Sequence, residues 1–238
     1  MLASAQMDRS GRPGRLMRGY LHKTSNNLCG IKGYASLIVA GADEQRTTTW
    51  ARRILAEVAQ MEAVQRSVQD LAFPRPSSAP DGTLDAAVGA SVAEARRVHP
   101  RLVAKVCLGA TGALLLPARD LQLVLGELLA NAAEAAASAR VAITTVAPRD
   151  GRVALLLADS GPGLPREILP EAAEPFVTTK AGHLGIGLAR VDTIMQMHGL
   201  AWSLANADEG GAVACLEVAS APGAARRAAS GAQKGSHV

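Results

Sequence analysis

Two long stretches with apolar residues at helical spacing, joined by a short turn, constrain the first third of the chain most strongly. Such steps of three and four along a helix place the apolar side chains on one seam. The first seam consists of Leu21, Thr24, Leu28, Ile31, Ala35 and Ile38, and the second of Ile54, Val58, Met61, Val64, Val68 and Leu71. Gly41 ends the first pattern, and the second runs from about Thr47 to Ala72. The two stretches predict an antiparallel helical hairpin. Because one hairpin cannot bury both seams, we expect two copies to form a four-helix bundle.

A segment dense in proline, serine and glycine, FPRPSSAPDG at residues 73–82, predicts a linker between two domains. Apolar patterns of helical and strand type alternate beyond it, which predicts an α+β sandwich with helices on one face of a mixed sheet. Helices are expected near 84–97, from a cap at Asp120 to 137, and near 186–198, with strands in 101–109, 113–117, 141–159, 201–206 and 212–219. The expected segments are a flexible N-terminus (1–14), the hairpin (15–72), the linker (73–83), the second domain (84–219) and a disordered tail (220–238).

The composition excludes several classes of protein. Hydrophobic residues make up 48% of the 238 residues, so the chain can bury a core. No apolar run approaches the roughly 18 residues of a membrane span, and the charged N-terminus differs from a signal peptide. Three widely spaced cysteines argue against a disulfide framework and favour a reducing, cytoplasmic location.

The net charge of +4 is concentrated near the N-terminus, between Arg9 and Lys23. A basic arm of this kind can follow nucleic acid or acidic lipid. Aromatic residues, which provide stacking platforms for bases, make up only 3% of the chain. We therefore interpret the charges as a solvated helix face and expect no nucleic-acid partner.

Three elements of the second domain carry polar and glycine residues suited to nucleotide chemistry. Glu127 and Asn131 lie four apart on a predicted helix, so their oxygens share a face and suit Mg²⁺. Asp159, Gly161 and Gly163 follow an apolar strand, where a carboxylate can reach the amino group of a purine and glycines allow close approach. The third element runs from Phe176 through Lys180 to the glycines at 182, 185 and 187, which open a helix and can cradle an anion.

The order of these elements resembles the ATP-binding domain shared by histidine kinases, Hsp90, type II topoisomerases and MutL. ELLANAAEA resembles the family's Asn box, DSGPG its first glycine box, EPFVTTK its Phe box and GHLGIGLA its second glycine box. The resemblance implies ATP and Mg²⁺ as cofactors and a short lid, because His183 stands where longer lids have glycine. It assigns Asn131 and Glu127 to the metal, Asn131 also to the phosphates, Asp159 to adenine N6, Gly161 and Gly163 to the base pocket, and Lys180, Gly185 and Gly187 to the phosphates.

The first helix resembles the phospho-acceptor box of histidine kinases. In that box the histidine is followed by Leu six residues later, Ile nine residues later, Gly-Tyr-Ala eleven to thirteen residues later and Leu fifteen residues later. All of these residues are present at the same distances after His22. His22 sits beside the seam residue Leu21, so its imidazole should face solvent and accept a phosphoryl group in line from ATP.

Three residues of this box distinguish the chain from common members of the family. Lys23 replaces the usual acid after the histidine, and a charged lysine cannot accept the imidazole proton. It can instead help to neutralise the γ-phosphate. Asn26 matches the position that orients water in members with phosphatase activity. Asn27 replaces a frequent proline, which weakens the expected helix kink.

The resemblance therefore implies a sensor-less histidine kinase that autophosphorylates on His22 and passes the group to an aspartate of a response regulator receiver domain. It also implies a homodimer, and a separate sensory protein as the source of input. Two alternatives stay open, a histidine phosphotransferase with a vestigial ATPase domain and a phosphatase-biased regulator with weak autokinase activity. A chaperone- or repair-type ATPase is disfavoured by the acceptor box.

Overall fold

The computed structural model describes residues 12–41, 43–74, 79–109, 112–149, 151–180 and 183–220. The chain divides into two compact units. One contains the described residues between 12 and 74 together with Glu174–Ala189, and the other contains the described residues of 79–173 and 190–220. Residues 1–11 of the expected flexible N-terminus (1–14), 75–78 of the expected linker (73–83) and 221–238 of the expected tail (220–238) lie outside the described residues.

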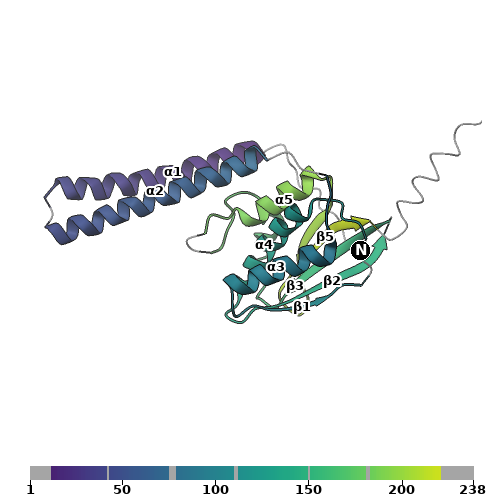
Figure 1. Ribbon diagram of the computed structural model, residues 1–238. Helices are drawn as coiled ribbons and strands as arrows, with labels where there is room; N and C mark the ends of the chain where they lie inside the picture. Colours follow the sequence, from purple (N-terminus) through teal and green to yellow (C-terminus); the bar gives the residue numbers. More distant parts are fainter. Residues whose placement is uncertain are drawn as a thin grey trace, which may run out of the picture. The chain divides into compact units, whose positions relative to one another are not determined.

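The helical hairpin consists of α1 (Arg12–Val39) and α2 (Glu44–Ala72), which lie side by side (Figure 1). Gly41 has a φ of 96° at the end of α1, a backbone conformation that favours glycine. Asp43 caps α2, because its Oδ1 accepts a hydrogen bond from the Arg46 N–H at 2.8 Å. Both helices are therefore present, with α1 starting at Arg12 rather than at Arg15.

The apolar seams of the hairpin are only partly covered within one chain. Val64 is buried at 1% exposure, but Leu21 and Leu28 on α1 are 55% and 54% exposed. The buried contact between the helices is instead polar at one point, where Asn27 is 5% exposed and its Nδ2 donates to the Glu57 carbonyl at 3.1 Å. The exposed leucines leave an apolar surface along α1.

The second unit contains a five-stranded mixed sheet in the order β1-β2-β3-β5-β4. β1 runs parallel to β2, and the other neighbouring pairs are antiparallel. The α+β prediction with a mixed sheet is confirmed. The elements are α3 (Leu84–Val98), β1 (Val103–Cys107), α4 (Ala118–Ala135), β2 (Arg140–Arg149), β3 (Arg152–Asp159), the 3₁₀ turn η1 (Leu169–Glu171), α5 (Gly187–Met197), β4 (Trp202–Asn206) and β5 (Ala212–Ser220).

The core of this unit lies between one face of the sheet and the helices. Alternate residues of β3 are buried, as in Val153, Leu155 and Leu157, while their neighbours are more exposed. This period of two is the pattern of a sheet with one covered face. The helices bury leucines against that face, including Leu121 and Leu125 of α4.

Two local predictions are wrong. Residues 113–117 form no strand. Their only β-type pairings within the described residues are two isolated bridges, from Ala113 to Thr83 and from Leu114 to Ala219. Asp120 does not cap α4, since Pro117 holds that position. The Asp120 carboxylate Oδ2 instead lies 2.8 Å from His198 Nε2 and ties the start of α4 to the region just after α5.

None of the helices in the described part of the chain has the length and apolar run needed to cross a bilayer.

Candidate functional site

One face of α4 carries the two predicted oxygen donors, Glu127 and Asn131, both half-buried. Together with Ala135, one further turn along α4, they form a row of three residues that extends about 12 Å. Arg190 Nη1 donates a hydrogen bond of 2.5 Å to Glu127 Oε1. Arg190 lies near the start of α5, and its guanidinium lies at one end of this row.

The predicted glycine loop lies at the other end of the same row. Asp159 is the last residue of β3, and its Oδ1 accepts a hydrogen bond from the Gly161 N–H at 2.7 Å. A Cβ added at Gly161 would lie 2.9 Å from both Ala135 Cβ and Asp159 Oδ1, so only glycine fits between α4 and the carboxylate. The structure therefore brings together the two predicted elements that contain Asn131 and Asp159.

Two residues that were not predicted hold this loop in place. Asn206, at the end of β4, accepts from the Leu164 N–H at 2.8 Å and donates to the Leu164 carbonyl at 2.7 Å. Gly211 has a φ of 88°, and a Cβ there would lie 1.9 Å from the Asp159 carbonyl oxygen. The sequence pattern predicts no role in the site for either residue.

The segment Glu174–Ala189 contains a tight contact between the Phe box and the second glycine box. Phe176 donates its N–H to the Gly185 carbonyl at 2.8 Å and has a positive φ of 68°. Gly185 has a φ of 69°, and a Cβ there would lie 2.6 Å from the Val177 carbonyl oxygen. A strained non-glycine residue of this kind is characteristic of functional loops.

The other predicted phosphate residues lie in the same segment. The Lys180 N–H donates to Thr178 Oγ1 at 3.1 Å, and Gly187 is the first residue of α5. His183 is exposed. Gly182, the first glycine of this box, lies outside the described residues.

The predicted acceptor His22 lies exposed on α1. Its ring Nε2 is 3.3 Å from the amide Nδ2 of Asn26, one helical turn further along. An amide N–H that donates to Nε2 favours the ring form with a lone pair on Nε2 and the proton on Nδ1. The arrangement presents a nucleophilic nitrogen next to an amide on the solvent side of the hairpin.

The basic residues near His22 differ in their environments. Lys23 is half-buried, and the described residues supply no ion-pair partner for it. Arg15 is not simply a solvated charge as predicted, because its guanidinium donates two hydrogen bonds of 2.9 Å to the Glu174 carboxylate. Arg9 lies outside the described residues.

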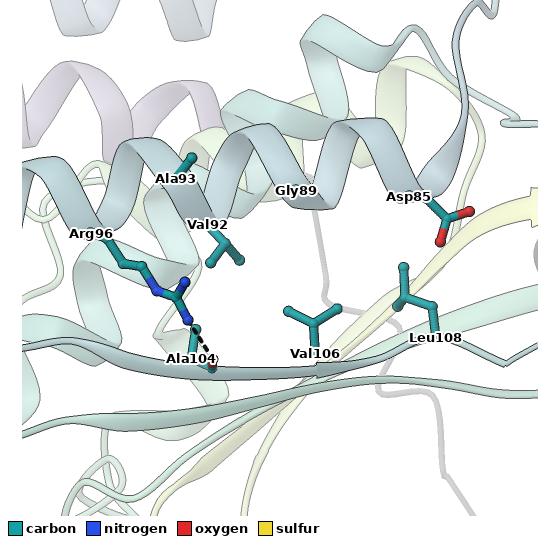
Figure 2. A pocket seen from close by; sticks show the side chains of 8 residues that line it. All are labelled: Asp85, Gly89, Val92, Ala93, Arg96, Ala104, Val106 and Leu108. Carbon is teal, nitrogen blue, oxygen red and sulfur yellow. Dashed lines mark hydrogen bonds between the residues drawn. The ribbon is translucent and has the colours of Figure 1, made fainter.

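An open groove between α3 and β1 contains none of the predicted site residues (Figure 2). Arg96 crosses it and donates to the Ala104 carbonyl at 2.8 Å. The groove is lined by Asp85, Gly89, Val92, Ala93, Arg96, Ala104, Val106 and Leu108.

The donor set for a metal is small. Among the described residues there is no group of three or more His, Cys, Asp or Glu side chains that could hold an ion. Glu127 and Asn131 supply two oxygen donors on adjacent turns of α4. Mg²⁺ is usually held by one or two protein oxygens, with water and substrate phosphates as its other ligands, so this donor set fits Mg²⁺ bound together with a nucleotide.

Parts of the chain are similar to known proteins. Residues 117–222 match the family model "Histidine kinase-, DNA gyrase B-, and HSP90-like ATPase". The chain is 26% identical over 198 residues to the signal transduction histidine-protein kinase AtoS of Escherichia coli, covering 82% of this chain and 33% of AtoS. It is 29% identical over 208 residues to the sensor histidine kinase ZraS of Klebsiella oxytoca, covering 83% of this chain and 44% of ZraS.

The fold is also similar to a solved structure, that of full-length ShkA in complex with AMPPNP. The two share a TM-score of 0.57 at 20% identity, covering 88% of this chain and 46% of the ShkA chain. The chain thus spans less than half the length of AtoS, of ZraS and of the ShkA chain.

Proposed function

Because residues 117–222 match the family of histidine kinase-, DNA gyrase B- and HSP90-like ATPases, we propose that the chain is an ATP-dependent protein-histidine kinase that phosphorylates its own His22. The observation that carries this proposal is the exposed His22 imidazole, whose Nε2 faces the Asn26 amide on a chain that also contains this ATPase domain. An exposed nucleophile suits a group that must first meet ATP and later a partner protein.

The nucleotide site proposed for this kinase uses both ends of the row on α4. Asp159 would accept a hydrogen bond from the adenine amino group. Its Oδ1 accepts a hydrogen bond from the Gly161 N–H, whereas its Oδ2 accepts none from the described residues. Gly161 and Gly163 would line the base pocket, since a side chain at either position would collide with Ala135 or Asn206.

The resemblance assigns the phosphates to Asn131 of α4 and to Lys180, Gly185 and Gly187 of the Glu174–Ala189 segment. Asn131 and Glu127 supply the oxygens for Mg²⁺, which would neutralise phosphate charge when bound. Lys180 adds a cation, and Gly185 and Gly187 offer backbone N–H groups at the start of α5. These assignments follow the resemblance residue by residue.

Phosphoryl transfer to His22 needs only its ring nitrogen as a nucleophile. Once the hydrogen bond from the Asn26 amide has opened, the Nε2 lone pair would attack the γ-phosphorus, the bond from phosphorus to the bridging oxygen would break, and ADP would leave with that electron pair. The Nδ1 proton can then pass to water, since His22 is exposed. Lys23 cannot accept this proton while its ammonium group is charged.

We propose that the protein works as a homodimer. Met17, Leu21 and Leu28 recur along α1 and are 54–55% exposed, and Leu55 on α2 is 67% exposed. A second hairpin would cover these side chains in a two-fold four-helix bundle. The receiver domain of a response regulator would take the phosphoryl group from His22, and a separate sensory protein would supply the input.

A second candidate function is dephosphorylation of that regulator. Asn26 favours it, because an exposed amide one turn from His22 can orient a water molecule toward a phospho-aspartate. A chain with this bias would hold a competent nucleotide site and show weak autokinase activity.

The proposal is tested by incubating the protein with γ-labelled ATP and following the label after acid or alkali. Phosphohistidine is lost in acid and kept in alkali, so we expect that behaviour of the wild type. His22→Gln should abolish labelling and keep nucleotide affinity. His99→Gln, the same substitution at the C-cap of α3, is the matched control and should label normally. Acid-labile label that persists in His22→Gln would refute the assignment.

A further inference from the structure

The ion pair between Arg190 and Glu127 is a feature of the nucleotide site that the proposed roles leave unexplained. The guanidinium Nη1 and the carboxylate Oε1 are 2.5 Å apart, and the side chains of Arg190 and Glu127 are 30% and 25% exposed. Charge-assisted hydrogen bonds of this kind are stronger than neutral ones, and partial burial reduces screening by salt. The pair is therefore a defined contact and not a loose surface pair.

The position of Arg190 on α5 is unusual for a cation. It lies in the first turn of the helix, where the helix dipole disfavours positive charge. Its neighbours Ala189 and Val191 are fully buried at 0% exposure, while Arg190 reaches out from this apolar stretch. An acceptor on α4 offsets the unfavourable placement, and Glu127 supplies it.

The guanidinium and a metal ion compete for the negative charge of this one carboxylate. Mg²⁺ binds oxygen at about 2.0–2.1 Å, and a second cation next to it would be repelled. An ion bound by the Glu127 carboxylate therefore weakens its pairing with Arg190. While the pair is intact, Glu127 carries no uncompensated charge that would repel the phosphates of a metal-free nucleotide.

We propose that Arg190 is a resident counter-cation of the nucleotide site, which neutralises Glu127 when metal is absent and competes with Mg²⁺ for its carboxylate. This inference rests on the proposed nucleotide-binding function. The pair should weaken the coupling between metal and nucleotide binding. Compared with a site that has an unpaired carboxylate, this site should bind metal-free nucleotide more tightly and should need a higher Mg²⁺ concentration for half-saturation. Arg190 thus acts as a positioning residue.

The test is a binding titration of the full chain with a non-hydrolysable ATP analogue, first in EDTA and then at increasing Mg²⁺. Arg190→Met keeps much of the side chain's length and removes the charge. We expect it to weaken metal-free binding about three- to tenfold and to lower the half-saturating Mg²⁺ concentration by a similar factor. Arg190→Lys keeps the charge and should stay within about threefold of wild type.

The partner substitution completes the cycle. Glu127→Gln should raise the Mg²⁺ requirement, and adding Arg190→Met in that background should leave the Mg²⁺ midpoint unchanged. Equal weakening of binding by Arg190→Met with and without Mg²⁺ would mean a direct phosphate contact and would overturn the proposal. A half-saturating Mg²⁺ concentration in the single variant Arg190→Met equal to that of the wild type would overturn it too. Circular dichroism checks that each variant is folded. A folded wild type that binds no nucleotide would overturn the proposed function itself, and this inference with it.

Discussion

Substituting alanine for Gly211 should displace Asp159 from its position at the end of β3. A Cβ at residue 211 would lie 1.9 Å from the Asp159 carbonyl oxygen, well inside the contact distance of real Cβ atoms, so one of the two must move by about 1 Å or more. The φ of 88° adds strain of about 1–2 kcal/mol, and the forced repacking adds about 1–3 kcal/mol. If Asp159 holds the adenine amino group, affinity for an ATP analogue should fall at least about tenfold.

Gly210 provides a matched control for this substitution. It has a φ of 95°, so Gly210→Ala carries similar backbone strain, but the nearest atom to its added Cβ is the Gly161 carbonyl oxygen at 3.9 Å. Gly210→Ala should lower the free energy of unfolding by about 1–2 kcal/mol and leave affinity within about threefold. Thermal unfolding and calorimetry measure the two quantities. Equal affinity losses in the two variants would refute the reasoning, because backbone strain alone would then explain them.

Three further predictions concern the hairpin and a cysteine of the sheet. Leu28→Glu should raise the dimer dissociation constant about tenfold or more by light scattering, whereas Leu28→Met should not; equal behaviour of the two would contradict the bundle. Lys23→Glu should raise the initial autophosphorylation rate by about tenfold or more while Lys23→Gln does not, and a lower rate in Lys23→Glu would show that Lys23 acts as a phosphate-side cation. Burial, with a smaller contribution from Glu217, raises the pKa of the Cys215 thiol, so its thiolate fraction at a given pH is reduced. Iodoacetamide should therefore label Cys215 several-fold more slowly than Cys29, with a rate that rises only at higher pH. Equal labelling rates for the two cysteines would contradict this.

The local elements were predictable because their signals are periodic. The seams at Leu28 and Val64 lie on long helices, and the alternation around Leu155 gives a strand with one buried face. The resemblance to a histidine kinase core with an ATP-binding domain of the histidine kinase and Hsp90 type is confirmed by the match over residues 117–222 and by the histidine kinases similar to the chain.

What the sequence did not reveal depends on contacts between distant residues. Asp120 has the chemistry of a helix cap, but its carboxylate bonds His198, 78 residues away. Asn206 holds the loop after Gly163 from a different strand, and Arg190 reaches Glu127 from another helix. Asn27 could be read only as a missing proline, although it is the buried hydrogen-bond donor between α1 and α2.

The most direct test of the central claim is to locate the phosphoryl group on the protein. Wild-type chain with ¹⁵N-labelled histidines would be incubated with ATP and Mg²⁺, and the phosphorylated ring nitrogen assigned by heteronuclear NMR, with His22→Gln used to assign the signal. The account predicts one phosphohistidine, at His22 Nε2, the nitrogen that faces the Asn26 amide. Phosphorylation on Nδ1 would contradict the assigned ring form, and phosphorylation on His99 or His183 in place of His22 would contradict the kinase mechanism itself.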